Sequence, residues 1–104
     1  MEQKKTNNAT LKQYQEFCAK GWKKGCCREV FLLGLGGETG EVMKVVKKSI
    51  RDEKPIDIPH LKEELGDVMW YVANVCTIFG LELQEIVDEN IYKLSARYKD
   101  LIKE

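Results

Sequence analysis

Two stretches decide the fold of this chain: Gly34-Leu35-Gly36-Gly37-Glu38-Thr39-Gly40-Glu41-Val42 and Leu61-Lys62-Glu63-Glu64-Leu65-Gly66-Asp67-Val68. Each contains two acidic residues three positions apart, Glu38 with Glu41 and Glu64 with Asp67. That separation places both side chains on one face of a helix, with Cβ atoms roughly 5–6 Å apart. If the two helices pack together, four carboxylates form a cluster whose members repel each other unless a cation lies among them. Such a cluster is typical of a Mg²⁺ site, and Mg²⁺ in proteins usually accompanies phosphate groups.

The apolar pattern on either side of these stretches has the period of a helix. It predicts four helices, at residues 9–21, 28–50, 60–79 and 82–102. Pro55 and Pro59 fall within the loop between the second and third helices, and Gly80 is a suitable end for the third. Because no segment alternates with period two, we expect an all-α fold, a small four-helix bundle-like domain that includes an antiparallel helix pair.

The angular positions of the acids predict that they meet. In the second helix the apolar stripe has Glu38 near its middle and Glu41 at its edge. In the third helix Glu64 lies at the edge of the stripe, Asp67 a little further round, and Tyr71 on the Glu64 side. A short loop makes the two helices antiparallel neighbours, so edges displaced in the same direction face each other. The predicted stripes are Phe31, Leu35, Val42, Val45 and Val46, and Leu61, Leu65, Val68, Val72, Val75, Cys76 and Phe79.

Other interpretations of these residues remain open. Acidic pairs at this spacing commonly lie on solvated helix faces, although a carboxylate in the middle of an apolar stripe, such as Glu38, is costly to leave unpaired. Two roles remain open for the four glycines within the second helix. They either allow close packing between helices or leave room for a ligand near the acids. They are Gly34, Gly36, Gly37 and Gly40.

Length and composition limit the classes of function. The 104 residues suit one domain, spanning residues 1–104 with a core of about 10–102. With 17 basic and 17 acidic residues, binding to a nucleic acid polymer or to an anionic membrane is not favoured. The first residues lack the apolar core of a signal peptide, and the apolar run at 68–83 is too short and interrupted to span a bilayer. We therefore expect a cytoplasmic protein with its four cysteines as reduced thiols.

Further polar and aromatic residues are candidates for substrate binding. Asn90, Lys93 and Arg97 form a polar stripe on the fourth helix that suits phosphate oxygens, or an ordinary set of solvated charges and salt bridges. The candidates for stacking on a base are Phe17, Trp22, Trp70 and Tyr71, although aromatic residues in a small helical protein more often belong to a core or an interface. Because the third helix is apolar on most sides around Met69–Tyr71, we expect a second subunit to cover it.

At these residues the sequence resembles the MazG-like nucleotide pyrophosphohydrolases of the all-α NTP pyrophosphatase superfamily. The resemblance covers about residues 10–98. It rests on the ExxE motif Glu38–Glu41, the ExxD motif Glu64–Asp67, and Asn90-Ile91-Tyr92-Lys93-Leu94 followed by Arg97-Tyr98. ExxE alone is a weak signal, whereas these motifs in this order are specific.

The resemblance implies Mg²⁺-dependent hydrolysis of a nucleoside triphosphate to its monophosphate and pyrophosphate, with Mn²⁺ as an alternative ion. The metal ligands and catalytic residues would be Glu38, Glu41, Glu64 and Asp67. The substrate contacts would come from Lys93 and Arg97 at the phosphates, Asn90 beside them, and Tyr71 in the nucleotide pocket. Family members are dimers or tetramers, which implies a homodimer or homotetramer here. We favour Glu38 as the general base or as a residue that orients it, since burial would raise its pKa.

Two alternatives remain. One is phosphoribosyl-ATP pyrophosphohydrolase, a relative with a similar acidic arrangement. The other is a non-catalytic helical module whose acids bind a structural ion or a basic partner. Redox iron is disfavoured because the chain has no Glu-x-x-His pair, and we expect His60, the single histidine, to be a helix-start residue.

Overall fold

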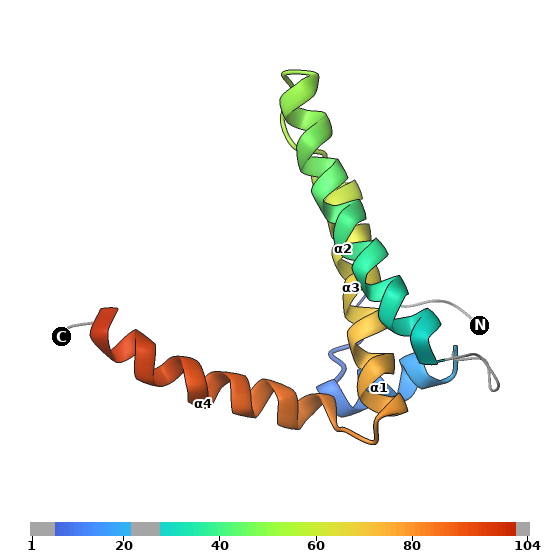
Figure 1. Ribbon diagram of the computed structural model, residues 1–104, viewed down its shortest axis with the longest axis vertical. Coiled ribbons are helices and arrows are strands. Elements are labelled where there is room, and N and C mark those ends of the chain that lie inside the picture. Colours follow the sequence, from blue (N-terminus) through green and yellow to red (C-terminus); the bar gives the residue numbers. More distant parts are fainter. Residues whose placement is uncertain (1–5, 22–27, 102–104) are drawn as a thin grey trace.

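The computed structural model describes residues 6–21 and 28–101, which form four helices and no strand. The helices are α1 (Leu11–Ala19), α2 (Arg28–Arg51), α3 (Ile58–Ile78) and α4 (Leu83–Leu101) (Figure 1). The predicted all-α class is confirmed, and the predicted helix ends agree to within two residues. Over the described residues, none of the helices has the length and apolar character needed to cross a lipid bilayer.

The helix ends follow local sequence signals. Thr10 caps α1 in a reciprocal capping box with Gln13. Asp57 caps α3, where its carboxylate accepts a hydrogen bond of 3.2 Å from the backbone N–H of His60. His60 is therefore a helix-start residue, as predicted. Gly80 follows α3 with φ +69°, a left-handed conformation that favours glycine and allows the chain to turn into α4.

The helices are arranged as one long arm with two elements at its base. α2 and α3 lie side by side as an antiparallel hairpin, whereas α1 packs against the C-terminal part of α3 and α4 extends away to one side (Figure 1). A small core forms where α1, α3 and the start of α4 meet, and it contains Cys18, Ala73, Cys76 and Leu83. Cys18 and Cys76 are buried free thiols in this core.

One polar side chain of α1 also joins the start of α4 to α1. The amide of Gln15 donates to the carbonyl oxygen of Leu81 at 2.9 Å and accepts from the backbone N–H of Leu83 at 2.7 Å. These two residues form the turn after α3 and the first position of α4. Gln15 thus holds the start of α4 against α1.

The single chain has an unusually open shape. Its radius of gyration is 16.8 Å, whereas a compact domain of this length has roughly 13 Å. Its accessible surface is 9007 Å², against roughly 6,000 Å² for a typical folded monomer of 12.0 kDa. Among the described residues, only six apolar side chains are fully buried. Much apolar surface therefore remains uncovered in one copy of the chain.

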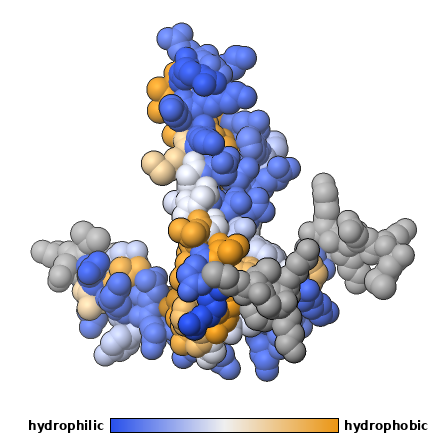
Figure 2. Space-filling model, turned by 45° about the vertical axis from the view of Figure 1, so that its right-hand side comes forward, coloured by the Kyte–Doolittle hydropathy of each residue, from blue (hydrophilic) through white to orange (hydrophobic). Residues whose placement is uncertain are grey.

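Part of that surface lies along the α2–α3 hairpin. Of the residues predicted for the two apolar stripes, Val46, Leu65 and Phe79 remain exposed, because one helical partner covers only one side of each helix. Seven of the exposed apolar residues of the two long helices are together called the hairpin apolar face. They are Leu32, Met43, Val46, Ile50, Ile58, Leu65 and Met69. Figure 2 shows apolar side chains on the upper part of the long arm and in a larger patch at its base.

The α2 part of this face has the spacing of a helix–helix seam. Its exposed members, together with the small residues Gly36 and Thr39, follow one another at alternating intervals of four and three. They run Leu32, Gly36, Thr39, Met43, Val46, Ile50. This interval is the one that allows one helix to pack lengthwise on another. The seam has no partner among the described residues.

The glycines of α2 differ in their surroundings. A Cβ at Gly34 would clash with the ring of Tyr71, so a side chain there would displace the ring. At Gly36, Gly37 and Gly40 an added Cβ would meet no such neighbour within 4 Å. Close packing therefore accounts for Gly34, whereas the other three leave open space.

Candidate metal and phosphate site

Three of the four predicted acids converge between α2 and α3. Glu38 on α2 and Glu64 and Asp67 on α3 each offer a carboxylate oxygen, and these oxygens all lie within 4.8 Å of one another. Glu38 and Glu64 are half-buried, while Asp67 is exposed. The convergence follows from the register of the hairpin, which places the Glu38 turn of α2 beside the turn of α3 from Glu64 to Asp67.

The cluster is electrostatically unfavourable for Glu38. Burial raises the pKa of its carboxyl, and the negative charges of Asp67 and Glu64 raise it further, together with a hydrogen bond to Glu64 and the charge of Glu41. This is the direction expected from the position of Glu38 in the apolar stripe. A cation among the three carboxylates would remove the repulsion that produces it.

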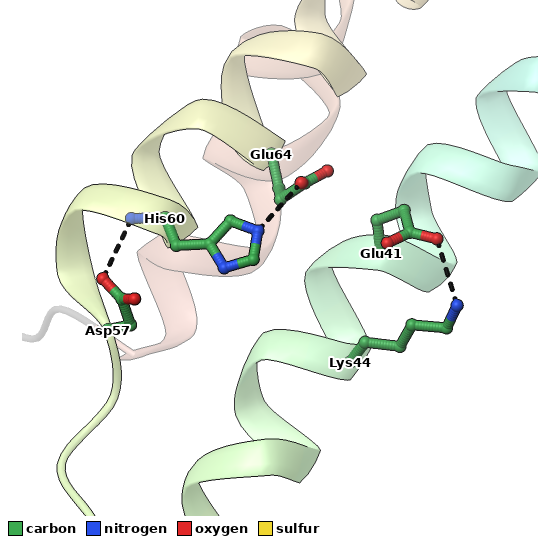
Figure 3. Close-up of polar contacts among 5 residues, drawn as sticks. All are labelled: Glu41, Lys44, Asp57, His60 and Glu64. Carbon is green, nitrogen blue, oxygen red and sulfur yellow. Dashed lines mark hydrogen bonds and ion pairs between the residues drawn. The ribbon is translucent and has the colours of Figure 1, made fainter.

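Glu41 lies one turn beyond the group of three. Its Oε1 accepts a hydrogen bond of 3.2 Å from the ammonium of Lys44, and its side chain is 46% exposed (Figure 3). It is close enough to raise the pKa of Glu38 by its charge. Glu41 therefore borders the cluster from the side of the α2–α3 loop.

His60 is a site neighbour that the sequence analysis placed only at the start of the helix. Its Nε2 lies 3.2 Å from Oε1 of Glu64, whose side chain is only 15% exposed (Figure 3). Since an ionised carboxylate accepts and cannot donate, the imidazole N–H is the donor. The i,i+4 spacing of His60 and Glu64 on one helix was the signal that could have identified this contact.

Aromatic residues adjoin the cluster on the side away from the loop. Tyr71 lies one turn after Asp67 and packs edge-on against Trp70, with ring centroids 5.0 Å apart. Trp70 in turn stacks on Phe31 at 5.9 Å. Tyr71 is thus held in a half-buried aromatic group next to the acids. Trp22, another aromatic residue predicted to contact substrate, lies outside the described residues.

The remaining predicted substrate residues are separate from the acids within one chain. Asn90, Lys93 and Arg97 are exposed on α4. Among the described residues, α4 contacts α1 and α3 and makes no contact with α2. One copy of the chain therefore does not bring the α4 residues and the acidic cluster together.

A pocket of about 350 Å³ lies beside the cluster, at the loop end of the hairpin. Glu41 and His60 form its boundary with the acids. Its other charged residues come from the end of α2, the loop and the cap of α3; they are Lys44, Lys48, Asp52, Lys54 and Asp57. The sequence analysis did not assign a role to this group.

The fold and the site define a class: an all-α domain in which a helical hairpin presents a cluster of carboxylates suited to a divalent cation. Residues 28–102 match the family model of the MazG nucleotide pyrophosphohydrolase domain, and the chain belongs to this family. The resemblance identified from the two acidic motifs is confirmed.

A curated relative, the Gene 37 protein of Mycobacterium phage L5, is 39% identical over 69 residues. That region is 62% of this chain and 60% of the relative. The chain thus matches about three-fifths of the relative's length, and the relative's name states no activity. No solved structure matches the chain.

The residues present fit a hard divalent cation. The converging atoms are all carboxylate oxygens, which is the ligand chemistry of Mg²⁺, Mn²⁺ and Ca²⁺ rather than of zinc or copper. The negative charges of the neighbouring carboxylates contribute to the raised pKa of Glu38, and a bound cation would offset this repulsion. The geometry therefore supports a metal site without identifying the metal.

Proposed function

We propose that this protein catalyses Mg²⁺-dependent hydrolysis of a nucleoside or deoxynucleoside triphosphate to the monophosphate and pyrophosphate, and so removes surplus or aberrant nucleotides in the cytoplasm. Membership of the MazG family supports the general reaction. The observation that carries the proposal is the convergence of Glu38, Glu64 and Asp67 across the hairpin. Three carboxylates so close to one another favour binding of a multivalent cation, and Mg²⁺ is the usual partner of nucleotide phosphates.

The chemistry is displacement at the α-phosphorus. The oxygen of a water molecule bonds to this phosphorus, the bond to the bridging oxygen breaks, and pyrophosphate leaves with that oxygen. When bound, Mg²⁺ supplies charge neutralisation for the phosphate oxygens and acidifies water. In our proposal Glu41, Glu64 and Asp67 hold the metal and keep its position fixed.

Glu38 is the acid that we propose for proton transfer as well as for metal binding. Its carboxylate is half-buried and lies with those of Glu64 and Asp67, so it would adjoin a water molecule held by a metal at this cluster. His60 donates a hydrogen bond to Glu64 and so restricts the orientation of that ligand.

The substrate contacts on α4 require a second copy of the chain in this proposal. The hairpin apolar face is exposed and has the spacing of a helix–helix seam, and the single chain is too open to bury its apolar surface. We propose that two hairpins pack face to face in a homodimer, the unit from which a tetramer would also be built. Asn90, Lys93 and Arg97 of each copy would then reach the triphosphate held at the acids of the other.

The test is a malachite-green assay coupled to inorganic pyrophosphatase, over canonical and damaged nucleotides and phosphoribosyl-ATP, with and without Mg²⁺. Orthophosphate that is released only when pyrophosphatase is present supports the proposal. Turnover of phosphoribosyl-ATP alone would assign the protein to histidine synthesis instead. Failure on every nucleotide, with Glu41→Gln and Asp67→Asn altering only stability or partner binding, would indicate a non-catalytic module.

A further inference from the structure

The pocket at the loop end of the hairpin carries three lysines beside the acidic cluster. Lys44 and Lys48 come from successive turns of α2, and Lys54 comes from the loop that follows. All three are exposed, and the pocket opens to solvent next to Glu41. The pocket also contains three acids, so its lining is close to neutral in formal charge.

Each of those acids already has a partner in the protein, and the partner of Glu41 is Lys44. Asp52 pairs with Arg51 at 3.0 Å, and this hydrogen bond holds the pKa of the Asp52 carboxyl below its usual range. Asp57 is occupied as the cap of α3. In contrast, the ammonium groups of Lys48 and Lys54 form no hydrogen bond or salt bridge with the described residues, although the charge of Lys48 also contributes to the lowered pKa of the Asp52 carboxyl. The ammonium groups of the pocket that remain able to donate hydrogen bonds to a ligand are therefore those of Lys48 and Lys54.

The pocket has a definite place along the hairpin. Tyr71 and Gly34 meet on one side of the acids, and the lysines lie on the other, toward the loop. With a rise of 1.5 Å per residue, Lys44 and Lys48 lie about 9 Å and 15 Å along α2 from Glu38. An aromatic group, a carboxylate cluster and a cationic pocket thus follow one another in a line. A nucleoside triphosphate has matching parts in the same order: a base, an α-phosphate and two terminal phosphates.

We propose that this pocket binds the pyrophosphoryl group, which is the β- and γ-phosphates of the substrate before hydrolysis and free pyrophosphate afterwards. The inference rests on the proposed function. It assigns Lys48 and Lys54 as phosphate-binding residues, with Lys44 between them and Glu41. It also fixes the direction of the nucleotide along the hairpin, with the base toward Tyr71 and the leaving group toward the loop.

The experiment measures binding by calorimetry in the presence of Mg²⁺, with inorganic pyrophosphate, a non-hydrolysable α,β-imido nucleotide and a nucleoside monophosphate as probes. The variants are Lys48→Gln and Lys54→Gln, with Lys48→Arg as the charge-preserving variant. Lys12→Gln, an exposed lysine of α1 outside the pocket, controls for the loss of one positive charge. Circular dichroism checks the fold of each variant, and Lys54→Gln, which changes only the loop, serves if Lys48→Gln does not fold.

We expect Kd for pyrophosphate and for the imido nucleotide to rise about tenfold in each Gln variant, the effect of losing one charge-assisted hydrogen bond. Kd for the monophosphate should stay within about twofold, because it lacks the pyrophosphoryl group, and Lys48→Arg should retain affinity for all three probes. Unchanged pyrophosphate binding in both Gln variants, or equal weakening of all three probes, would overturn the inference.

The two proposals fail in different ways. If the wild-type protein hydrolyses nucleotides but its lysine variants bind pyrophosphate normally, the reaction stands and the pocket assignment is wrong. If the wild type hydrolyses no nucleotide, the proposed reaction is wrong whatever the lysines bind. Wild-type protein that turns over nucleotides yet has no affinity for pyrophosphate also removes the pocket assignment.

Discussion

The α2–α3 hairpin and α4 present their polar residues in opposite ways. On the hairpin, Glu38 and Glu64 are half-buried between two packed helices, and their carboxylates are held near each other by the register of the pair. On α4, Asn90, Lys93 and Arg97 are exposed on a helix that leaves the rest of the chain. The comparison shows that one copy brings three acids together by itself, whereas the α4 residues that we propose for phosphate contact need another element to reach them.

The largest expected effect tests the hairpin half. Asp67→Asn removes one of the converging carboxylates while preserving its shape, so it should lower kcat/KM by about 10³-fold or more, since metal binding supplies several kcal/mol of transition-state stabilisation. The coupled pyrophosphatase assay measures the rate, and Glu63→Gln, an exposed acid on the same helix outside the cluster, is the matched control. Near-normal turnover in Asp67→Asn would show that the cluster does not serve the reaction.

The next effect tests whether α4 acts across two copies. Arg97→Ala should lower kcat/KM by about 10–100-fold, the range for losing a hydrogen bond to a charged group. If α4 completes the site of another copy, an equilibrated equal mixture of Asp67→Asn and Arg97→Ala proteins should regain about a quarter of wild-type activity, because half of the dimers then contain one intact site. If the activity of the mixture equals the average of the activities of the two variants, α4 does not complete the site of another copy.

A smaller effect concerns the support of a ligand within the hairpin. His60→Ala removes the donor to Glu64 but keeps the backbone N–H that Asp57 caps, so we expect Kd for Mg²⁺ to rise about tenfold with little change in helix content. His60→Gln, which retains an N–H donor, should recover part of the affinity. Equal Mg²⁺ affinity in His60→Ala and the exposed control Lys62→Ala would mean that Glu64 needs no such support.

The smallest effect is on stability without metal. Because the folded state raises the pKa of Glu38, its ionised form is penalised above that raised pKa, and the penalty disappears as the pH falls below the ordinary range of a glutamate. In EDTA, Glu38→Gln should therefore raise Tm by a few degrees at neutral pH and abolish turnover, and the difference in Tm should vanish in acid. A variant that melts below the wild type at neutral pH would contradict the crowding of charge at this position.

The helices and the convergence of the acids could be predicted from the sequence because their signals are local. Caps, prolines and a period of 3.6 fix each helix, and a short loop fixes the register of the α2–α3 pair. The direction of α4 could not be predicted in this way. Its polar stripe shows which side chains share a face, but the angle at Gly80 depends on contacts with α1 that no periodicity reveals.

Two further features could not be predicted from the sequence, for different reasons. The contact of His60 with Glu64 has a spacing signal, but any i,i+4 pair on an exposed helix has the same one. In the sequence, Lys48 and Lys54 have the pattern of ordinary solvated charges. Only the fold of the loop at the end of α2 places them around one pocket. The sequence therefore predicts where the acids lie better than what surrounds them.

The hydrogen bonds of Gln15 have a consequence for where the working unit of this protein begins. The match to the family model begins at residue 28, after α1. However, Gln15 of α1 forms hydrogen bonds with both the turn after α3 and the first residue of α4. A fragment trimmed to the matched region would keep all four acids but lose the hydrogen bonds of Gln15 that hold the start of α4. The N-terminal helix thus helps to set the direction of α4, although it contributes no acid to the cluster.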